Sequence, residues 1–434
     1  MPREMEGGRG GRSARVAHRE PPRGGPWGTQ GDMAGLAVDL SGAERVRAAA
    51  PITLVPEAFA TLEAAEALWR DLEAARDVVM TPYQRFDWAV AYMATVGREA
   101  GARPLVTVLR DPAGRVRLLL PLAVRRERGL TIARIIGDRH ANFHMPVFAT
   151  REAAALRPEA IAAALRSLGR AAGIDAFAFT HQPQIWEGVA NPLAVGGTPS
   201  ASDAYGMLLD PDAETTTRRL FSGDARRKLR QKEKWLTAAH GPVTHRVAAT
   251  REEADAILAA YLAQKAARFA KLGLPDPFAE PAARDFLAAA SRPSPAGAAA
   301  LELHALRAQA DGRILATFIG VTDARRFSGM LTSFDPDPSL ARFSPGDLLL
   351  HGLVRDQIER GRLALDLGVG EAHYKARICD ETIRLVDGLV PVSPRGRLFA
   401  VAARLGVTVK RRIKRSPRLR ALADRLRRVL RRPE

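Results

Sequence analysis

An internal repeat, offset by roughly 200 residues, constrains the fold of this 434-residue chain more than any other feature of its sequence. Residues 105–124 have two apolar runs around the turn Pro112-Ala113-Gly114-Arg115. Residues 301–321 have two apolar runs around Ala310-Asp311-Gly312-Arg313. Short apolar runs joined by a glycine-containing turn predict a β-hairpin in each half. The chain is therefore expected to contain two copies of one α/β unit.

Each predicted hairpin lies within the same order of elements. Helical patterns precede it, a third strand and a helix follow, and a further strand ends the unit. The polar, Pro/Gly/Ser-rich stretch 191–217 is the predicted junction between the units. In the first unit we expect helices at 62–75, 85–96 and 151–172 and later strands at 131–137 and 175–180; in the second, helices at 251–271, 280–291 and 345–360 and later strands at 327–334 and 363–368.

The length of the chain and the distribution of its charge indicate further domain and tail boundaries. A chain of 434 residues is too long for one ordinary domain, and the net charge of +18 is concentrated in residues 397–434, where 14 Lys/Arg stand against 2 acidic residues. The Gly/Arg/Pro-rich start lacks the apolar stretch of a secretory signal, and Met33 is a candidate initiator. We predict a disordered extension at 1–45, domains at 46–215 and 216–395, and a basic tail at 396–434.

The cellular location follows from two absences in the sequence. No apolar run approaches the roughly 18 residues of a membrane span. Cys379 is the single cysteine, so an internal disulfide framework and a cysteine-based zinc site are excluded. Both observations favour the reducing cytoplasm.

The tail from Lys410 onward has apolar residues at helical spacing among many arginines, which predicts a basic amphipathic helix. Such a helix can lie on an anionic membrane surface, pack against a partner or bind nucleic acid. We favour the membrane surface and rank nucleic acid last. The apolar positions are Leu419, Leu422, Leu426, Val429 and Leu430.

The clearest candidate site lies where the second unit passes from its third strand into a helix. A helix that begins at Pro345-Gly346 directly after a strand leaves its first backbone N–H groups free to bind a phosphate. The next strand ends at Gly368-x-Gly370, where the backbone can turn sharply, and Tyr374-Lys375 follow. Together these features indicate group transfer from a phosphate-bearing donor.

Several short motifs occur in the order and spacing of a known family. They are Phe86-Asp87-Trp88, Leu119-Leu120-Pro121-Leu122, Ile136-Gly137, Ala225-Arg226-Arg227-Lys228-Leu229-Arg230, Ser344-Pro345-Gly346 and Asp366-Leu367-Gly368-x-Gly370-x-x-x-Tyr374-Lys375. With them, residues 51–392 resemble the GNAT acyltransferases, and more closely the CelD-like group of bacterial acetyltransferases. The double-GNAT architecture of that group is similar to that of the Fem-type peptidyltransferases.

The resemblance implies an α/β (α+β) fold of two tandem GNAT-like domains, each a mixed, largely antiparallel sheet flanked by helices, with the active site in the second. It also implies transfer of an acyl group from acetyl-CoA or another acyl-CoA. The acceptor would be an amine or hydroxyl of a small or lipid-linked cell-envelope or polysaccharide precursor.

One departure from the GNAT pattern keeps other functions open. GNAT enzymes usually place Arg/Gln-x-x-Gly-x-Gly/Ala at the pyrophosphate of CoA. Here the corresponding sequence is Arg342-Phe343-Ser344-Pro345-Gly346-Asp347, in which only Gly346 can take that part. Fem-type relatives lack the CoA turn and use aminoacyl-tRNA. A tRNA-dependent peptidyltransferase and a non-catalytic partner of a polysaccharide synthase are therefore the alternatives.

Four residues near the end of the second unit are the catalytic candidates. Lys375 with Tyr374 is similar to the pair that Fem-type enzymes use near the donor and acceptor phosphates, and an ammonium suits a phosphate or an oxyanion. Tyr374 is the candidate acid, and Asp366 and Glu371 are carboxylates within reach. Their plainer interpretations are a solvated lysine, a core tyrosine, a turn-capping aspartate and a helix-start glutamate. The candidate cofactor-binding residues are Arg342, Ser344, Pro345, Gly346, Asp347, Gly368 and Gly370.

Two further features have weaker interpretations. His140 and His144 flank Asn142 and Phe143 in a loop. A metal site is disfavoured because no third ligand is near, which leaves an acceptor-pocket lining or ordinary loop histidines. The basic run 226–235 is expected on a helix, either as a solvated face or as an electrostatic guide for an anionic substrate. We expect no metal cofactor.

Overall fold

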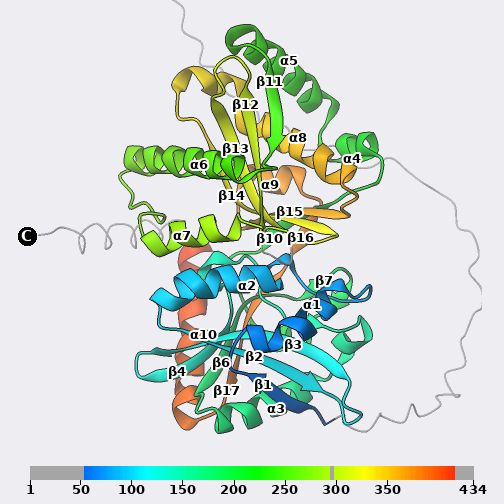
Figure 1. Cartoon of the computed structure of the whole chain (residues 1–434), viewed down its shortest axis with the longest axis vertical. Helices are drawn as coiled ribbons and strands as arrows, with labels where there is room; N and C mark the ends of the chain where they lie inside the picture. The colour runs from blue at the N-terminus through cyan, green and yellow to red at the C-terminus, as the bar shows by residue number, and fades with distance from the viewer. Residues whose placement is uncertain (1–52, 294–297, 416–434) are drawn as a thin grey trace, which may run out of the picture. The chain divides into compact units, whose positions relative to one another are not determined.

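The computed structural model describes residues 53–293 and 298–415, and it contains two mixed β-sheets flanked by helices (Figure 1). This confirms the α/β class that the repeated pattern predicts. The predicted disordered extension at 1–45 and the tail beyond residue 415 lie outside the described residues.

The first sheet has the strand order β1-β2-β3-β4-β6-β17-β9, with β5 paired to β3. Its strands pair antiparallel except β4 and β6, which run parallel from Ile132↔Ala176 to Arg134↔Ala178. The strands are β1 (Val55–Phe59), β2 (Arg103–Arg110), β3 (Val116–Glu127), β4 (Leu130–Ile135), β5 (Val147–Phe148), β6 (Ala176–Pro183), β9 (Thr198–Pro199) and β17 (Leu385–Pro391), beside a small hairpin of β7 (Ile185–Trp186) and β8 (Val189–Ala190); the helices of this half are α1 (Glu66–Ala74), α2 (Phe86–Tyr92), α3 (Pro158–Ala171) and α10 (Pro394–Arg415).

The second sheet repeats this arrangement with the order β11-β12-β13-β14-β15-β10-β16. Here too a single pair is parallel, β14 with β15, and it occupies the same place in the order as β4 with β6. The strands are β10 (Ala204–Leu208), β11 (Val243–Val247), β12 (Leu301–Ala308), β13 (Ile314–Thr322), β14 (Arg326–Phe334), β15 (Ala364–Val369) and β16 (Glu381–Ile383); the helices are α4 (Ala213–Leu220), α5 (Gly223–His240), α6 (Arg251–Leu272), α7 (Pro281–Ala290), α8 (Pro345–Glu359) and α9 (His373–Ile378).

The side chains of β12 alternate between two apolar clusters, which shows which helix covers each face of the second sheet. Leu303 and Ala305 lie in the apolar cluster that contains Tyr261 of α6. Leu306, on the opposite face, lies in the cluster that contains Leu353 of α8. Because successive side chains of a strand point to opposite faces, α6 and α8 pack on different sides of the sheet.

Each sheet also contains a strand from the far side of the predicted boundary at 215. β17 comes after the second sheet in sequence, yet it pairs with β6 in the first. β10 comes before α4, yet it pairs with β15 and β16 in the second. The predicted junction at 191–217 therefore contains two sheet strands, β9 and β10. The domain boundaries at 215 and 395 stay a prediction.

The two halves share buried contacts. The indole ring of Trp88 on α2 meets the ring of Phe286 on α7 edge to face, with 4.8 Å between centroids. The Arg85 guanidinium donates to the carbonyl oxygens of Ala299 and Thr322 at 3.2 and 3.1 Å. Such contacts bring first-half side chains to the second sheet, next to the site described below.

Candidate active site

The candidate site is built around the place where β14 and β15 separate. The two strands pair in parallel from Arg326↔Ala364 to Ser328↔Asp366, and the pairing ends there. Beyond the last pair the two strands diverge as a fork, with Gly329 on β14 and Gly368 on β15 close to its base. A Cβ atom on Gly368 would lie 2.7 Å from the Gly329 carbonyl oxygen, and its φ of +72° is left-handed. Position 368 therefore requires glycine, because the backbones of β14 and β15 are in close contact there and the φ angle is positive.

Helix α8 begins beside this fork, as the Pro345-Gly346 pattern predicts. Its N-cap residue, Ser344, has φ +49° and ψ 61°, and no side chain caps the first turn. The hydroxyl of Ser344 accepts a hydrogen bond from Nζ of Lys232 on α5 at 2.7 Å. The same ammonium lies 3.8 Å from the Asp347 carboxylate. A positive helix end and a lysine therefore meet at one point, which suits an anionic group.

A pocket of about 470 Å³ opens at this helix end, between α4, α5, α8 and α9. The charged residues of its wall are mostly basic, and two are acidic, Asp224 and Asp347. Tyr374 lines the same pocket, so the structure brings two sequence candidates, Asp347 and Tyr374, together. The five basic residues of the wall are Arg218, Arg219, Lys228, Lys232 and Arg377.

Lys375 lies one residue beyond this pocket lining and is turned inward. Its side chain is buried, and Nζ donates to the carbonyl oxygens of Gly368 and Val369 at 3.1 and 3.4 Å. Burial lowers the pKa of Lys375, although the nearby Asp366 charge opposes that shift. In this arrangement Lys375 stabilises the backbone turn at Gly368 and Val369.

Asp366 lies fully buried at the base of the fork. Its Oδ1 accepts hydrogen bonds from the Ser328 hydroxyl at 2.9 Å and from the Gly368 amide at 3.1 Å. Its Oδ2 lies 3.6 Å from the Arg326 guanidinium. Burial raises the pKa of Asp366 to about 6, against the lowering effect of Arg326.

The other sequence candidates are spread around the fork. Glu371 is exposed in the loop between β15 and α9, and Gly370 has φ +114° there. Pro345 is buried and Gly346 half-buried. Arg342 is exposed and stacks on the ring of Phe343, 4.6 Å from its centroid. None of these residues lines the pocket.

The sequence argument missed the polar residues that join the two halves at the fork. The amide of Asn142 donates to the Gly329 carbonyl at 3.0 Å and accepts from the Val369 amide at 3.3 Å, so it bridges the two separating strands. It also donates to the hydroxyl of Tyr83 at 2.6 Å, and Ser328 Oγ lies 3.2 Å from that hydroxyl. Burial raises the pKa of Tyr83 far above its usual range.

A weak sequence signal existed for Asn142 alone. It is the polar residue between His140 and His144, the two histidines interpreted as a pocket lining. Nothing in the spacing connects it to a strand that lies 187 positions away. His144 is buried, its Nδ1 lies 3.0 Å from the Thr180 carbonyl, and burial lowers its pKa to about 4.

One group in the described part of the chain has the spacing of a metal site: Glu302, His304 and Asp356. Its carboxylates already have cationic partners, since Arg362 donates twice to Glu302 and Arg360 pairs with Asp356 at 2.7 Å. Guanidinium groups therefore occupy the place that a cation would take. His140 and His144 do not belong to this group.

Comparison with known proteins agrees with this geometry. Residues 223–376, which contain α5, α8, the fork and α9, match the family model described as an acetyltransferase (GNAT) domain. No curated protein matches the sequence.

Among solved structures, the fold is similar to that of FemX, with a TM-score of 0.55 and 10% identity over 79% of this chain and 99% of that chain. A tandem GNAT protein from the clavulanic acid biosynthesis pathway has a TM-score of 0.42 and 15% identity, covering 79% of this chain and 99% of that chain. L-PGS from Bacillus licheniformis has a TM-score of 0.42 and 13% identity, covering 74% and 96%. Residues 223–376 therefore match a GNAT acetyltransferase domain, and the fold of the chain is similar to that of FemX.

Proposed function

We propose that this protein is an acyltransferase that moves an acyl group from acyl-CoA to an amine or hydroxyl of a cell-envelope or polysaccharide precursor, as in the CelD-like group that its sequence resembles. The observation that carries this proposal is the start of α8, which has no side-chain cap and lies beside Lys232 and the other basic residues of the pocket. A donor with several phosphate charges fits a helix N-terminus surrounded by five cationic side chains.

The proposed chemistry uses the same pocket. The acceptor nitrogen or oxygen attacks the thioester carbonyl carbon and loses a proton to solvent water. The carbon–sulfur bond breaks, and the leaving thiolate takes a proton from an acid that solvent then reprotonates. Tyr374 is the proposed donor of that proton, because burial raises the pKa of its phenol and keeps it protonated near neutral pH. Lys375 acts as a positioning residue, since its ammonium holds the turn between β15 and α9.

Calorimetric titration of the full chain with CoA, acetyl-CoA and longer acyl-CoAs tests the donor site. We expect Lys232→Gln to weaken CoA binding about tenfold, a loss on the order of 1.4 kcal/mol, because it removes one charge-assisted contact at the helix end. Lys234→Gln, on the exposed face of the same helix, is the matched control and is expected to bind as wild type does.

Activity assays with the two kinds of donor separate the alternatives. Release of free thiol from acetyl-CoA in the presence of an amine acceptor would support acyl transfer. Activity that needs aminoacyl-tRNA and is abolished by ribonuclease would support a tRNA-dependent peptidyltransferase instead. If neither donor binds, the acyltransferase proposal is wrong and a non-catalytic partner of a synthase becomes the better account.

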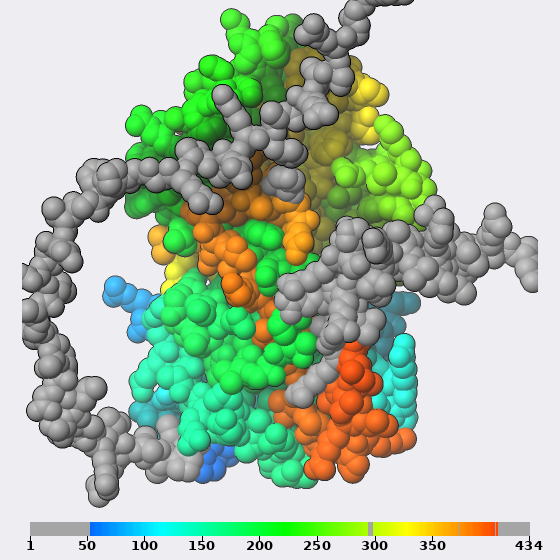
Figure 2. Space-filling view, turned by 180° about the vertical axis from the view of Figure 1, so that it is seen from behind, coloured from blue at the N-terminus to red at the C-terminus, as the bar shows by residue number. Residues whose placement is uncertain are grey.

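We further propose that the protein works in the cytoplasm, at the inner face of an anionic membrane. Helix α10 exposes Leu398, Val401 and Leu405, which follow one another at helical spacing. Figure 2 shows α10 as a red-orange band on the surface of the first half. The described helices include none that is long and apolar enough to cross a bilayer. An apolar stripe among basic residues suits binding to a membrane surface.

A further inference from the structure

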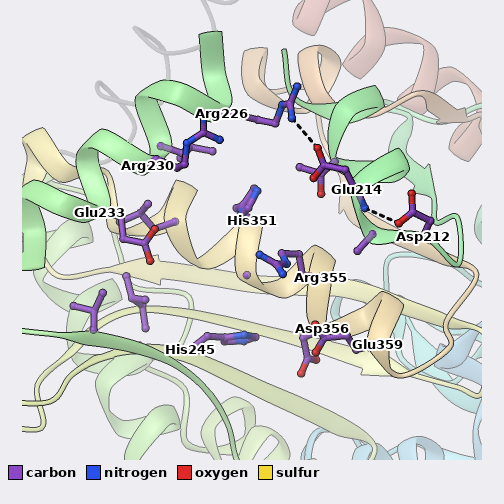
Figure 3. A pocket seen from close by; sticks show the side chains of 17 residues that line it. Asp212, Glu214, Arg226, Arg230, Glu233, His245, His351, Arg355, Asp356 and Glu359 are labelled. Atoms are coloured by element: carbon purple, nitrogen blue, oxygen red, sulfur yellow. Dashed lines mark hydrogen bonds and ion pairs between the residues drawn. The ribbon is translucent and has the colours of Figure 1, made fainter. Parts of the chain in front are cut away.

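The larger of the two pockets that α5 lines does not indicate one class of ligand. It encloses about 900 Å³ between α4, α5, α8 and β11, and its lining contains both acidic and basic side chains (Figure 3). Arg226 and Glu214 of this lining already form an ion pair of 3.1 Å. A mixture of this kind favours neither anions nor cations. The fork between β14 and β15 has a more specific arrangement.

The side chain of Asn142, which belongs to the first half, occupies the fork. Its Nδ2 donates to the Gly329 carbonyl oxygen at 3.0 Å, and its Oδ1 accepts from the Val369 amide at 3.3 Å. A Cβ atom on Gly368 would lie 2.5 Å from Nδ2 and 2.9 Å from Cγ of Asn142. The carboxamide is therefore packed against the backbone at the base of the fork, and it leaves no room there for a second group.

Asn142 makes the hydrogen bonds that a peptide group makes inside a sheet. A peptide group between two strands donates its N–H to a carbonyl of one neighbour and accepts from an N–H of the other. The carboxamide of Asn142 does both, with Gly329 on β14 and Val369 on β15. The backbone groups that Asn142 satisfies therefore suit a secondary amide of a ligand that enters the fork in an extended conformation.

Val369 cannot serve Asn142 and such a ligand together. A backbone N–H is a single donor, whereas a carbonyl oxygen has two lone pairs. A ligand carbonyl that accepts from the Val369 amide must therefore break its contact with Oδ1 of Asn142. The close packing at Gly368 also requires the carboxamide to leave the fork before the ligand amide can enter.

The displaced side chain has other partners available. Nδ2 of Asn142 also donates to the Tyr83 hydroxyl at 2.6 Å, the shortest of its three hydrogen bonds. Tyr83 belongs to the first half, as Asn142 does, so this contact does not depend on the fork. Asn142 is half-buried, so its carboxamide can turn toward water. The exchange of one amide for another therefore replaces every hydrogen bond that it breaks.

We propose that Asn142 is an autoinhibitory residue, which closes the fork in the free protein and is displaced by a secondary amide of the acyl donor. This role rests on the proposed acyl-CoA function, because the pantetheine arm that joins the thioester of acyl-CoA to its phosphates contains secondary amides. Asn142 therefore lowers the affinity for the arm of the donor and leaves the affinity for its nucleotide unchanged.

Calorimetric titration of the full chain tests this role, with CoA as one ligand and ADP, which lacks the pantetheine arm, as the other. We expect Asn142→Ala to bind CoA about tenfold more tightly than wild type does, because the ligand no longer competes with the carboxamide. Its affinity for ADP should equal that of wild type. Asn142→Ser is a second variant with the same expected result.

Asn191→Ala is the matched control. Asn191 is also a buried asparagine of the first half, and its Nδ2 donates to Oε1 of Gln182 at 3.0 Å, so its loss removes a buried carboxamide without a contact to the fork. It should bind CoA as wild type does. Thermal unfolding of each variant, followed by circular dichroism, shows that it is folded.

Two results would overturn the autoinhibitory role. One is a CoA affinity in both folded Asn142 variants that equals or falls below that of wild type, since the carboxamide would then only stabilise the fork. The other is an equal gain for CoA and ADP, since the variants would then have loosened the whole site. Failure of wild type and variants alike to bind CoA at millimolar concentration would instead contradict the acyl-CoA function on which this role rests.

Discussion

At the scale of single residues, the polar groups at the base of the fork form one connected cluster. Asp366 accepts from Ser328, the Ser328 and Tyr83 hydroxyl groups lie 3.2 Å apart, and Asn142 donates to Tyr83. Tyr83 and Asn142 belong to the first half, and Ser328 and Asp366 to the second. Buried polar groups of this kind are costly unless they are paired. The cluster therefore couples the shape of the fork to the packing between the halves.

Gly368→Ala is expected to destabilise the protein by about 2–4 kcal/mol. Alanine would adopt a left-handed φ of +72°, and its Cβ would lie 2.5 Å from the Asn142 amide nitrogen. The measurement is urea unfolding. Gly361→Ala is the matched control, because Gly361 has φ +74° and open space around it, so it should lose only about 1–2 kcal/mol. Equal losses at both positions would show that the Asn142 contact is unimportant.

The titration of Asp366 should appear in the pH dependence of stability. Its folded-state pKa of about 6 lies above the ordinary 3.8, so its contribution to stability is fully present below pH 3.8 and is lost as pH rises through about 6. The free energy of unfolding of wild type relative to Asp366→Asn should therefore fall between pH 4 and 7, by up to roughly 3 kcal/mol. A difference that stays constant over that range would contradict this assignment.

At the scale of elements, α5 has two separate surfaces. One side contributes Lys228 and Lys232 to the pocket at the start of α8. The other contributes Arg230 and Glu233 to the larger pocket above β11. Ser222 begins the helix by accepting from the Ala225 amide at 3.2 Å. The basic run at 226–235 is therefore divided between two pockets, and the predicted electrostatic guide stays a prediction for each.

The apolar stripe of α10 should bind anionic vesicles. Flotation of the full chain with vesicles rich in anionic lipid is expected to carry protein to the lipid fraction, and vesicles of neutral lipid should carry less. Replacing Leu398, Val401 and Leu405 by serine should reduce the bound fraction at least fivefold, because each buried CH₂ contributes about 0.8 kcal/mol. Leu272→Ser, an exposed leucine on α6, is the matched control. Undiminished flotation of the triple variant would exclude α10 as the anchor.

At the scale of the whole molecule, the exchange of β10 and β17 ties the two halves together. The first sheet is incomplete without β17, which lies between β6 and β9. The second sheet is incomplete without β10, which lies between β15 and β16. Separation of the halves would break both ladders and expose strand edges.

Fragments 1–215 and 216–434 are therefore expected to fail to unfold cooperatively when each is expressed alone. Neither contains all strands of its sheet, so each would lose backbone pairing and part of its core. Thermal unfolding followed by circular dichroism measures this. Co-expression of the two fragments should restore a single sharp transition. A sharp transition for either fragment alone would show that a boundary at 215 separates independent domains.

Much of the fold could be predicted from the sequence because short-range signals specify the elements of the repeated unit. The hairpin turns at 112–115 and 310–313 and the start of α8 at Pro345 follow from short-range turn and helix signals. Gly368 and Gly370 were recognisable for the same reason, since positive φ is a property of one residue.

Only the tertiary structure decided which side chains meet across long separations. Asn142 reaches a fork formed by residues more than 180 positions later, Lys232 contacts the start of α8 from 112 positions away, and His245 is hydrogen-bonded to His304 on the neighbouring strand. It likewise placed Lys375 against its own turn, a matter of packing that the Tyr-Lys motif does not encode. Local sequence determines φ, ψ and the amphipathic faces of helices and strands. Contacts between distant segments depend on how complete sheets pack, and residue spacing in the sequence does not specify that packing.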